Sequence, residues 1–173
     1  DVDLYYGRFD LDLRLTAGAF DAFDPYAIAL AVAFLAAGAA MAWLAVAQAP
    51  RRAAPWAFWA AVAPFCQIAA LWLVIGNLDI DLRFAAAGLA LAIALAAAAE
   101  GVARREDPAH AGGVGITFLA AGSAAALAFA LMPGFGPLTT TILTGLAAVL
   151  PAAASRVRAW PVLGWLAAGF GVV

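Results

Sequence analysis

The sequence predicts an all-α polytopic membrane protein, with about six transmembrane helices and two short amphipathic β-strands on the outer side. Hydrophobic residues make up 67% of the 173 residues and charged residues 12%, against roughly 45–50% and about 25% in an ordinary soluble domain. The mean hydropathy is +0.98. The apolar residues also come in runs of about twenty, the length at which a helix crosses the hydrocarbon core of a bilayer.

Six apolar runs follow one another between short polar junctions. A backbone in hydrocarbon has no water to bond, so each run is expected to be a helix and each junction to lie at a membrane surface. The fifth run is short and carries four threonines, whose hydroxyls are expected to bond the preceding turn of their own helix. The predicted spans are residues 26–47, 53–76, 82–99, 113–132, 138–154 and 159–173.

Two parts of the chain are distinguished by this pattern. Residues 1–25 form an extracytoplasmic segment that contains a predicted strand, and residues 26–173 form the transmembrane helical bundle. Pro133 and Pro137 mark the turn between the fourth and fifth spans, because proline cannot continue a regular helix. The chain begins at Asp1 and stops within an apolar run, so we expect it to be a piece of a longer protein.

The arginines predict the orientation of the spans. Six arginines fall in junctions that alternate with those holding the other three, and short loops rich in arginine stay in the cytoplasm. The acidic N-terminal segment is therefore expected to be extracytoplasmic, in a protein of the bacterial inner membrane. The six arginines are Arg51, Arg52, Arg104, Arg105, Arg156 and Arg158, and the three are Arg8, Arg14 and Arg83.

An acidic motif occurs twice in this otherwise apolar chain. The stretch FDLDLRL at residues 9–15 returns as LDIDLRF at residues 78–84. In both copies polar residues alternate with apolar ones, which is the period of a β-strand. Two spans separate the copies, so both are expected on the outer side. Because an isolated strand leaves backbone groups unpaired, each copy is the natural partner of the other.

Charge decides how the two strands would pair. A parallel in-register pair sets aspartate beside aspartate, which repels. An antiparallel pair centred on Asp12 and Asp81 instead sets Asp10 and Asp79 opposite arginines of the other strand. It leaves Asp12 facing Asp81, and two carboxylates so placed must share a proton or hold a cation between them. Asp12, Asp81, Asp10 and Asp79 are therefore the candidate metal or proton site.

Three interpretations of these aspartates stay open at this point. In the first they are the solvated, mutually neutralised face of a small outer sheet and bind nothing. In the second they bind a proton or a divalent cation. In the third they present a metal to a lipid-linked phosphate, as the acidic pair of a glycosyltransferase does. The recurrence of the motif indicates duplicated structure more strongly than it indicates chemistry.

Other features of the sequence exclude several functions. The net charge of −2 and the pI near 5.1 offer no basic surface for nucleic acid. Cys66 is the only cysteine and His110 the only histidine, which leaves no disulfide, no zinc site and no catalytic triad. Glu100 and the arginines after it are interpreted as a solvated helix end. We expect neither an enzyme nor a bound cofactor.

Junctions that combine arginine, proline and tryptophan separate the alanine- and leucine-rich spans, as in PRRAAPWAFW at residues 50–59 and SRVRAWPVLGWLAAGFGVV at residues 155–173. In this the chain resembles the large predicted bacterial membrane proteins catalogued as domain of unknown function 2339. Those proteins carry many more spans, so the resemblance implies that the chain is an internal segment of one. It implies no established activity and no functional residue.

The sequence therefore predicts a place in the cell more sharply than a reaction. Our leading hypothesis is a membrane-embedded structural or scaffold module of a large bacterial envelope protein, whose partners are the lipid bilayer and other segments of the same protein. No charged residue lies well inside a span, which argues against the translocating core of a pump. The alternative is a component of a transporter or lipid-linked transferase that uses the acidic extracytoplasmic site.

Overall fold

The computed structural model describes residues 25–49, 51–74, 78, 80–106 and 113–172. This part of the chain contains six helices and no β-strand. The helices are α2 (Pro25–Ala47), α3 (Ala53–Val74), α4 (Leu82–Ala103), α5 (Val114–Ala147), α6 (Val149–Val157) and α7 (Pro161–Val172).

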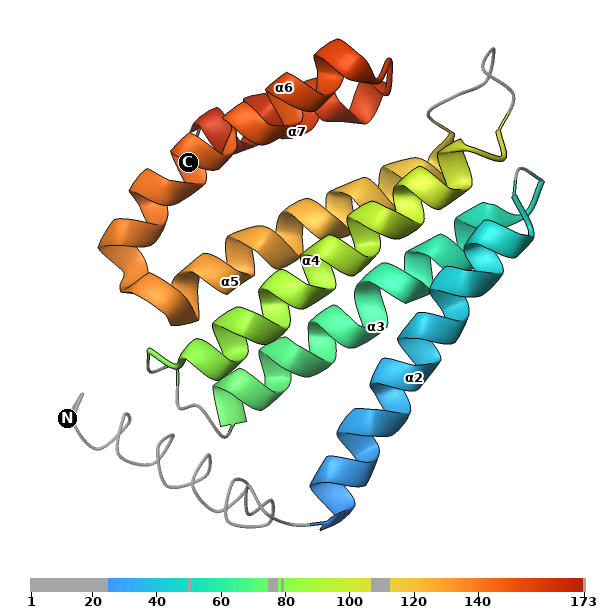
Figure 1. Ribbon diagram of the computed structural model, residues 1–173. Helices are drawn as coiled ribbons and strands as arrows, with labels where there is room; N and C mark the ends of the chain where they lie inside the picture. Colours follow the sequence, from blue (N-terminus) through green and yellow to red (C-terminus); the bar gives the residue numbers. More distant parts are fainter. Residues whose placement is uncertain (1–24, 50, 75–77, 79, 107–112, 173) are drawn as a thin grey trace, which may run out of the picture.

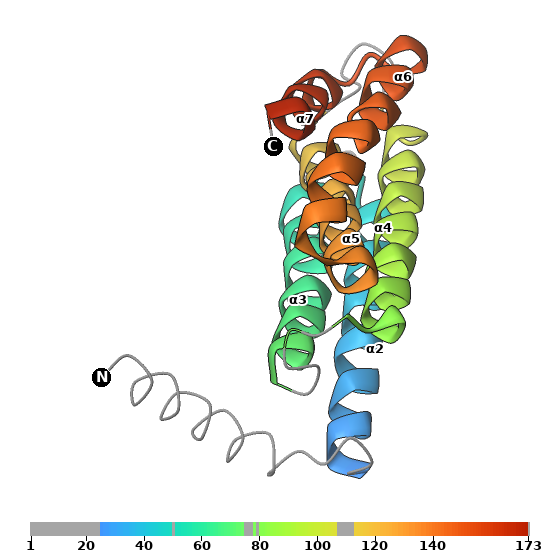
Figure 2. The same cartoon turned by 90° about the vertical axis from the view of Figure 1, so that its left-hand side faces the viewer.

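Helices α2, α3, α4 and the first part of α5 lie side by side in a bundle and alternate in direction (Figures 1 and 2). Within the bundle, α5 contacts both α3 and α4, and α2 contacts the same two helices. The last part of α5, together with α6 and α7, folds back over the first part of α5 as an arm (Figure 1). Val162 and Leu163 of α7 pack against Ala120 of α5 and hold the arm to the bundle.

Small residues let the bundle helices approach closely. The main core is built mostly from alanine, with Leu95, Val102, Ile116 and Leu119 as its larger members. A Cβ atom added at Gly122 of α5 would lie 2.6 Å from the Cβ of Ala61 in α3, closer than two carbon atoms can pack. In a bilayer, helices associate through such close van der Waals contact and not through water exclusion. The bundle helices therefore pack against one another mainly through alanine and glycine.

The prediction of a membrane-embedded protein is confirmed by the lengths of the helices. Four helical segments of the described chain are long and apolar enough to cross a membrane. Large apolar side chains also cover the outside of the bundle, as at Ile93, which is 62% exposed, and a soluble monomer rarely exposes extended apolar surface of this kind. The four segments are Ala53–Leu73, Leu82–Ala103, Val114–Phe135 and Thr139–Val157.

The prediction of six transmembrane helices is wrong for the described chain. A span needs about 20 apolar residues to cross roughly 30 Å of hydrocarbon. Four helical segments of the described residues reach this length, and not six. Within the described residues, two further apolar helical stretches, Ala33–Ala47 and Pro161–Phe170, are shorter than this.

The turn expected at Pro133 and Pro137 exists, but it lies inside a helix. Residues 114–147 form one element, α5, and not two helices joined by a loop. The hydroxyl of Thr140 donates to the carbonyl of Leu131 over 2.9 Å, whereas nine residues of a straight helix would separate these groups by about 13.5 Å. Helix α5 must therefore bend sharply between the two residues, and Figure 1 shows its ribbon turning back. Proline is the usual cause of such a kink.

One further prediction needs correction. The predicted strand at residues 78–84 is also wrong, since Leu78 is a turn residue with a φ of 60° and Leu82 begins helix α4. The other predicted strand, at residues 9–15, lies outside the described residues.

Candidate functional site

Of the four aspartates predicted to form a cation or proton site, the structure describes Asp81, while Asp10, Asp12 and Asp79 lie outside the described residues. Asp81 has extended backbone angles (φ −139°, ψ 112°) and is the N-cap of α4. Its Oδ1 accepts a hydrogen bond of 2.8 Å from the backbone N–H of Arg83. The sequence pattern that suggested a strand is thus the start of a helix. The side chain of the N-cap aspartate accepts from a backbone N–H group, which in a strand would need a partner strand.

The backbone of Asp81 also connects α4 to the kink of α5. Its N–H donates to the carbonyl of Pro133 over 2.8 Å. In a regular helix that carbonyl would accept from the residue four positions later, which is Pro137 and has no N–H. The start of α4 therefore supplies the donor that the proline kink lacks. Asp81 therefore stabilises the start of α4 with its side chain and the kink of α5 with its backbone N–H.

The charges around Asp81 are those of a helix cap. The Nε of Arg83 lies 3.5 Å from Oδ1 of Asp81, with the Arg83 side chain 91% exposed. Within the part of the chain that the structure describes, histidine, cysteine, aspartate and glutamate form no group of three that could hold a metal ion. The structure thus gives the Asp81 carboxylate a structural use, and the opposition of Asp81 to Asp12 stays a prediction.

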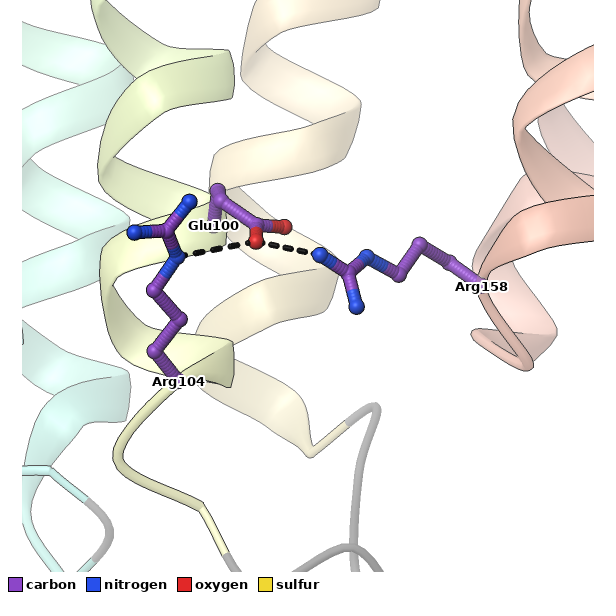
Figure 3. Close-up of polar contacts among 3 residues, drawn as sticks. All are labelled: Glu100, Arg104 and Arg158. Atoms are coloured by element: carbon purple, nitrogen blue, oxygen red, sulfur yellow. Dashed lines mark hydrogen bonds and ion pairs between the residues drawn. The ribbon is translucent and has the colours of Figure 1, made fainter.

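A second charged cluster lies at the other end of α4 and joins two distant parts of the chain (Figure 3). One carboxylate oxygen of Glu100, Oε1, is 3.1 Å from the Nε of Arg104, one turn later in the sequence. The same oxygen accepts from Nη2 of Arg158, which follows α6. Glu100 is only 27% exposed, so both arginines bond a carboxylate that is partly shielded from water. We call Glu100, Arg104 and Arg158 the arm clamp.

We expect the arm clamp to help hold α6 and α7 to the bundle. Arg158→Ala should lower the free energy of unfolding in detergent by about 1 kcal/mol, less than a fully buried charged hydrogen bond because the pair is partly exposed. Arg156 lies in the last turn of α6 and is not part of the arm clamp, so Arg156→Ala should cost no more than about 0.5 kcal/mol. Chemical denaturation measures the loss of stability in both variants. The difference between the two losses should be smaller at high salt than at low salt, because salt screens the ion pairs of the arm clamp.

A cavity of about 470 Å³ lies between α2, α3 and α4. Its lining is apolar except for Gln67 of α3 and Arg83 of α4. On the α2 side, Gly38 approaches Pro64 of α3 so closely that an added Cβ would lie 3.1 Å from the proline ring. Toward its N-terminal end, α2 leans away from α3 (Figure 1). The cavity is thus built between helices of the bundle, and Gln67 belongs to its wall.

The comparisons with known proteins add no relative. No family model, no curated protein and no solved structure matches this chain. The resemblance to the membrane proteins of domain of unknown function 2339 therefore stays a prediction, and the functional argument depends on the described residues alone.

Several of these contacts were invisible to sequence reasoning. Glu100 was interpreted as part of a solvated helix end, and its local pair with Arg104 follows the spacing of four that favours such contacts. Its second partner, Arg158, lies 58 positions away, and no periodic signal connects them. Ser123 was not singled out either, although its hydroxyl donates to the carbonyl of Ala92 in the neighbouring helix over 2.7 Å.

Proposed function

We propose that this chain is a membrane-embedded structural module of a larger bacterial envelope protein. The observation that carries the proposal is the placement of charge in the described spans. Charged residues occur in the first or last turns of the helices or beside them, as at Arg83, Glu100 and Arg156. The buried positions between these ends are alanine and other apolar residues, with Thr140 and Thr144 as the buried polar ones.

This distribution favours a structural role over a translocating one. An ionisable group inside a membrane is costly and is retained where it relays protons or binds ions. The interior of the described bundle instead shows closely packed small residues and an interhelical hydrogen bond from Ser123, which are the means by which membrane helices hold together. The apolar outer surfaces of the helices offer contact to lipid and to other segments of the longer protein.

The arginines support an orientation for the module. Arg51 and Arg52 precede α3, Arg104 and Arg105 follow α4, and Arg158 bonds Glu100. These positions share one end of the bundle (Figure 1), where Gly115 at the start of α5 lies against Ala53 at the start of α3. We propose that this end faces the cytoplasm, as short loops rich in arginine do. The start of α4 and the acidic N-terminal segment then face the outside, in the bacterial inner membrane.

Two substitutions of Asp81 test the structural role against a charge-dependent one. Asp81→Asn keeps an oxygen that can accept from Arg83 N–H, and asparagine caps helices about as well as aspartate. Asp81→Ala removes that acceptor and should lower the free energy of unfolding by about 1 kcal/mol. We therefore expect the Asn variant to unfold like the natural protein in detergent and the Ala variant to unfold earlier.

The same variants in liposomes examine transport directly. Vesicles loaded with dyes for protons and for divalent cations should leak no faster with the natural protein than with the Asp81→Asn variant. A proton or cation flux that the natural protein supports and the Asn variant abolishes would contradict the structural proposal. That result would instead favour the acidic site as part of a transporter, because the natural protein and the Asn variant differ in charge and not in capping.

A further inference from the structure

The cavity between α2, α3 and α4 has the size of a binding site. Its volume of about 470 Å³ lies within the roughly 300–1,000 Å³ of pockets that hold small molecules. It is walled by residues of three helices, such as Leu35 of α2, Ile68 of α3 and Leu91 of α4. This cavity is open to the outside of the bundle, since its lining residues Ala90 and Ala94 are exposed. A space of this size beside lipid is filled by lipid or by some ligand, because an empty one forfeits the van der Waals contacts of its whole lining.

The chemistry of the lining favours hydrocarbon as the occupant. Only Gln67 and Arg83 bring polar side chains to the cavity. A buried water needs two to four polar partners, so an almost wholly apolar wall suits water poorly. Aliphatic side chains instead match an acyl chain, which gains dispersion contacts at no cost in lost hydrogen bonds.

The length of the cavity matches one leaflet. Along α4 its lining runs from Arg83 to Leu95, which extends about 18 Å at 1.5 Å per residue. The hydrocarbon core of a bilayer is about 30 Å thick, so one leaflet is about half of that. Arg83 lies in the first turn of α4, at the membrane-surface end of the span. The cavity therefore reaches from the surface to about the middle of the bilayer, as a single acyl chain does.

Arg83 supplies a suitable group at the surface end. Its contact with Asp81 is made through Nε, and a guanidinium carries four further N–H donors on its two terminal nitrogens, which suit the oxygens of a phosphate. Asp81 offsets part of the positive charge, so the head group should add less to binding than the chain does. We propose that the cavity binds one acyl chain of a phospholipid, whose phosphate lies against Arg83.

Photolabelling in vesicles tests this site. The full chain is reconstituted in phosphatidylcholine that contains a small share of phosphatidylglycerol carrying a diazirine at the end of one acyl chain, and labelled peptides are mapped by mass spectrometry. We expect labelling to concentrate at the deep end of the cavity, near Leu95 and Ala60. Labels spread evenly over the outer, lipid-facing residues would overturn the proposal.

A matched pair of variants separates the cavity from the surface. Ala90 and Ala86 are both exposed alanines of α4, but Ala90 lines the cavity and Ala86 does not. Ala90→Trp should fill the space and reduce labelling near Leu95 by about tenfold, equivalent to about 1.4 kcal/mol, whereas Ala86→Trp should leave it unchanged. Equal labelling in the two variants would refute a built site.

Three further variants keep the test decisive. If Ala90→Trp prevents folding, judged by helical circular dichroism and gel filtration, Ala94→Phe fills the same cavity and Ala97→Phe is its exposed control on α4. Arg83→Gln should weaken retention of a phospholipid through purification, measured as bound phosphate per protein, while leaving the labelled position unchanged. Undiminished phosphate in this variant would overturn the role given to Arg83.

Discussion

Replacing Gly122 with leucine is expected to separate α3 from α5 and to produce a large loss of stability. The first atom of the new side chain alone would lie 2.6 Å from the Cβ of Ala61. Neither Cβ can rotate away, because both are bonded to the backbone, so the helices themselves must move. Overpacking costs roughly 1–3 kcal/mol in protein cores, and this contact should reach the upper part of that range. Thermal unfolding in detergent micelles, followed by circular dichroism, measures it.

Two companion variants make the cause of this loss specific. Gly145 has no atom within 4 Å of an added Cβ, so Gly145→Leu should be neutral or slightly stabilising, as glycine is a poor helix former. In the second, Gly122→Ala is combined with Ala61→Gly, which moves the methyl group from one helix to the other. The pair should recover most of the stability lost in Gly122→Ala. Failure of this rescue would show that the glycine is needed for another reason.

Leu119→Ala should give the second large effect. Leu119 is fully buried, at 0% exposure, in the main core cluster. In water-soluble cores this change costs about 2–5 kcal/mol, which combines lost transfer from water with the cavity left behind. Between membrane helices the transfer part is small, since lipid is as apolar as leucine. We therefore expect about 2 kcal/mol, from the cavity and the lost dispersion contacts.

Ile93 provides the control for this substitution. It is 62% exposed on α4, so its side chain contacts mainly lipid and few atoms of the protein. Ile93→Ala should therefore cost less than about 0.5 kcal/mol, as surface substitutions usually do. Unfolding in mild detergent by added denaturing detergent measures both variants under the same conditions. A loss at Ile93 as large as that at Leu119 would contradict the packing described for α4 and α5.

The helices of the bundle follow closely from the local sequence. The expected spans began at residues 26, 53 and 82, and helices α2, α3 and α4 begin at Pro25, Ala53 and Leu82. Apolar length and polar junctions are local properties, and in hydrocarbon a helix is the form in which one segment satisfies its own backbone. Such segments can be recognised without knowledge of their neighbours.

The second acidic motif shows why a period of two was a weaker signal. The alternation at residues 78–84 contains few positions, and a strand needs a partner to satisfy its backbone. Asp81 offers a local solution, since its side chain accepts from Arg83 N–H and starts a helix. A motif of the form aspartate before an apolar helical run is also an N-cap signal. That competing pattern was present in the sequence and was the stronger one.

Within the candidate site, the sequence singled out Asp81, but it predicted a cation or proton ligand and not the N-cap that the structure shows. Its backbone partner is the carbonyl of Pro133, and the carboxylate of Glu100 finds Arg158 beyond α6. Both contacts depend on the kink of α5, which turns the chain back over the bundle. The cavity likewise depends on how α2 leans relative to α3 and α4, which no single segment encodes.

By itself, the sequence determined that the chain forms apolar helices in a membrane, with charge at their ends, because a backbone without water must bond within its own segment. Only the tertiary structure decided where α5 reverses, and which distant groups meet at Glu100 and in the cavity. Helix formation is a local requirement of each segment. The contacts between helices depend on the fit of small side chains from distant parts of the chain, at distances as short as that between Gly122 and Ala61.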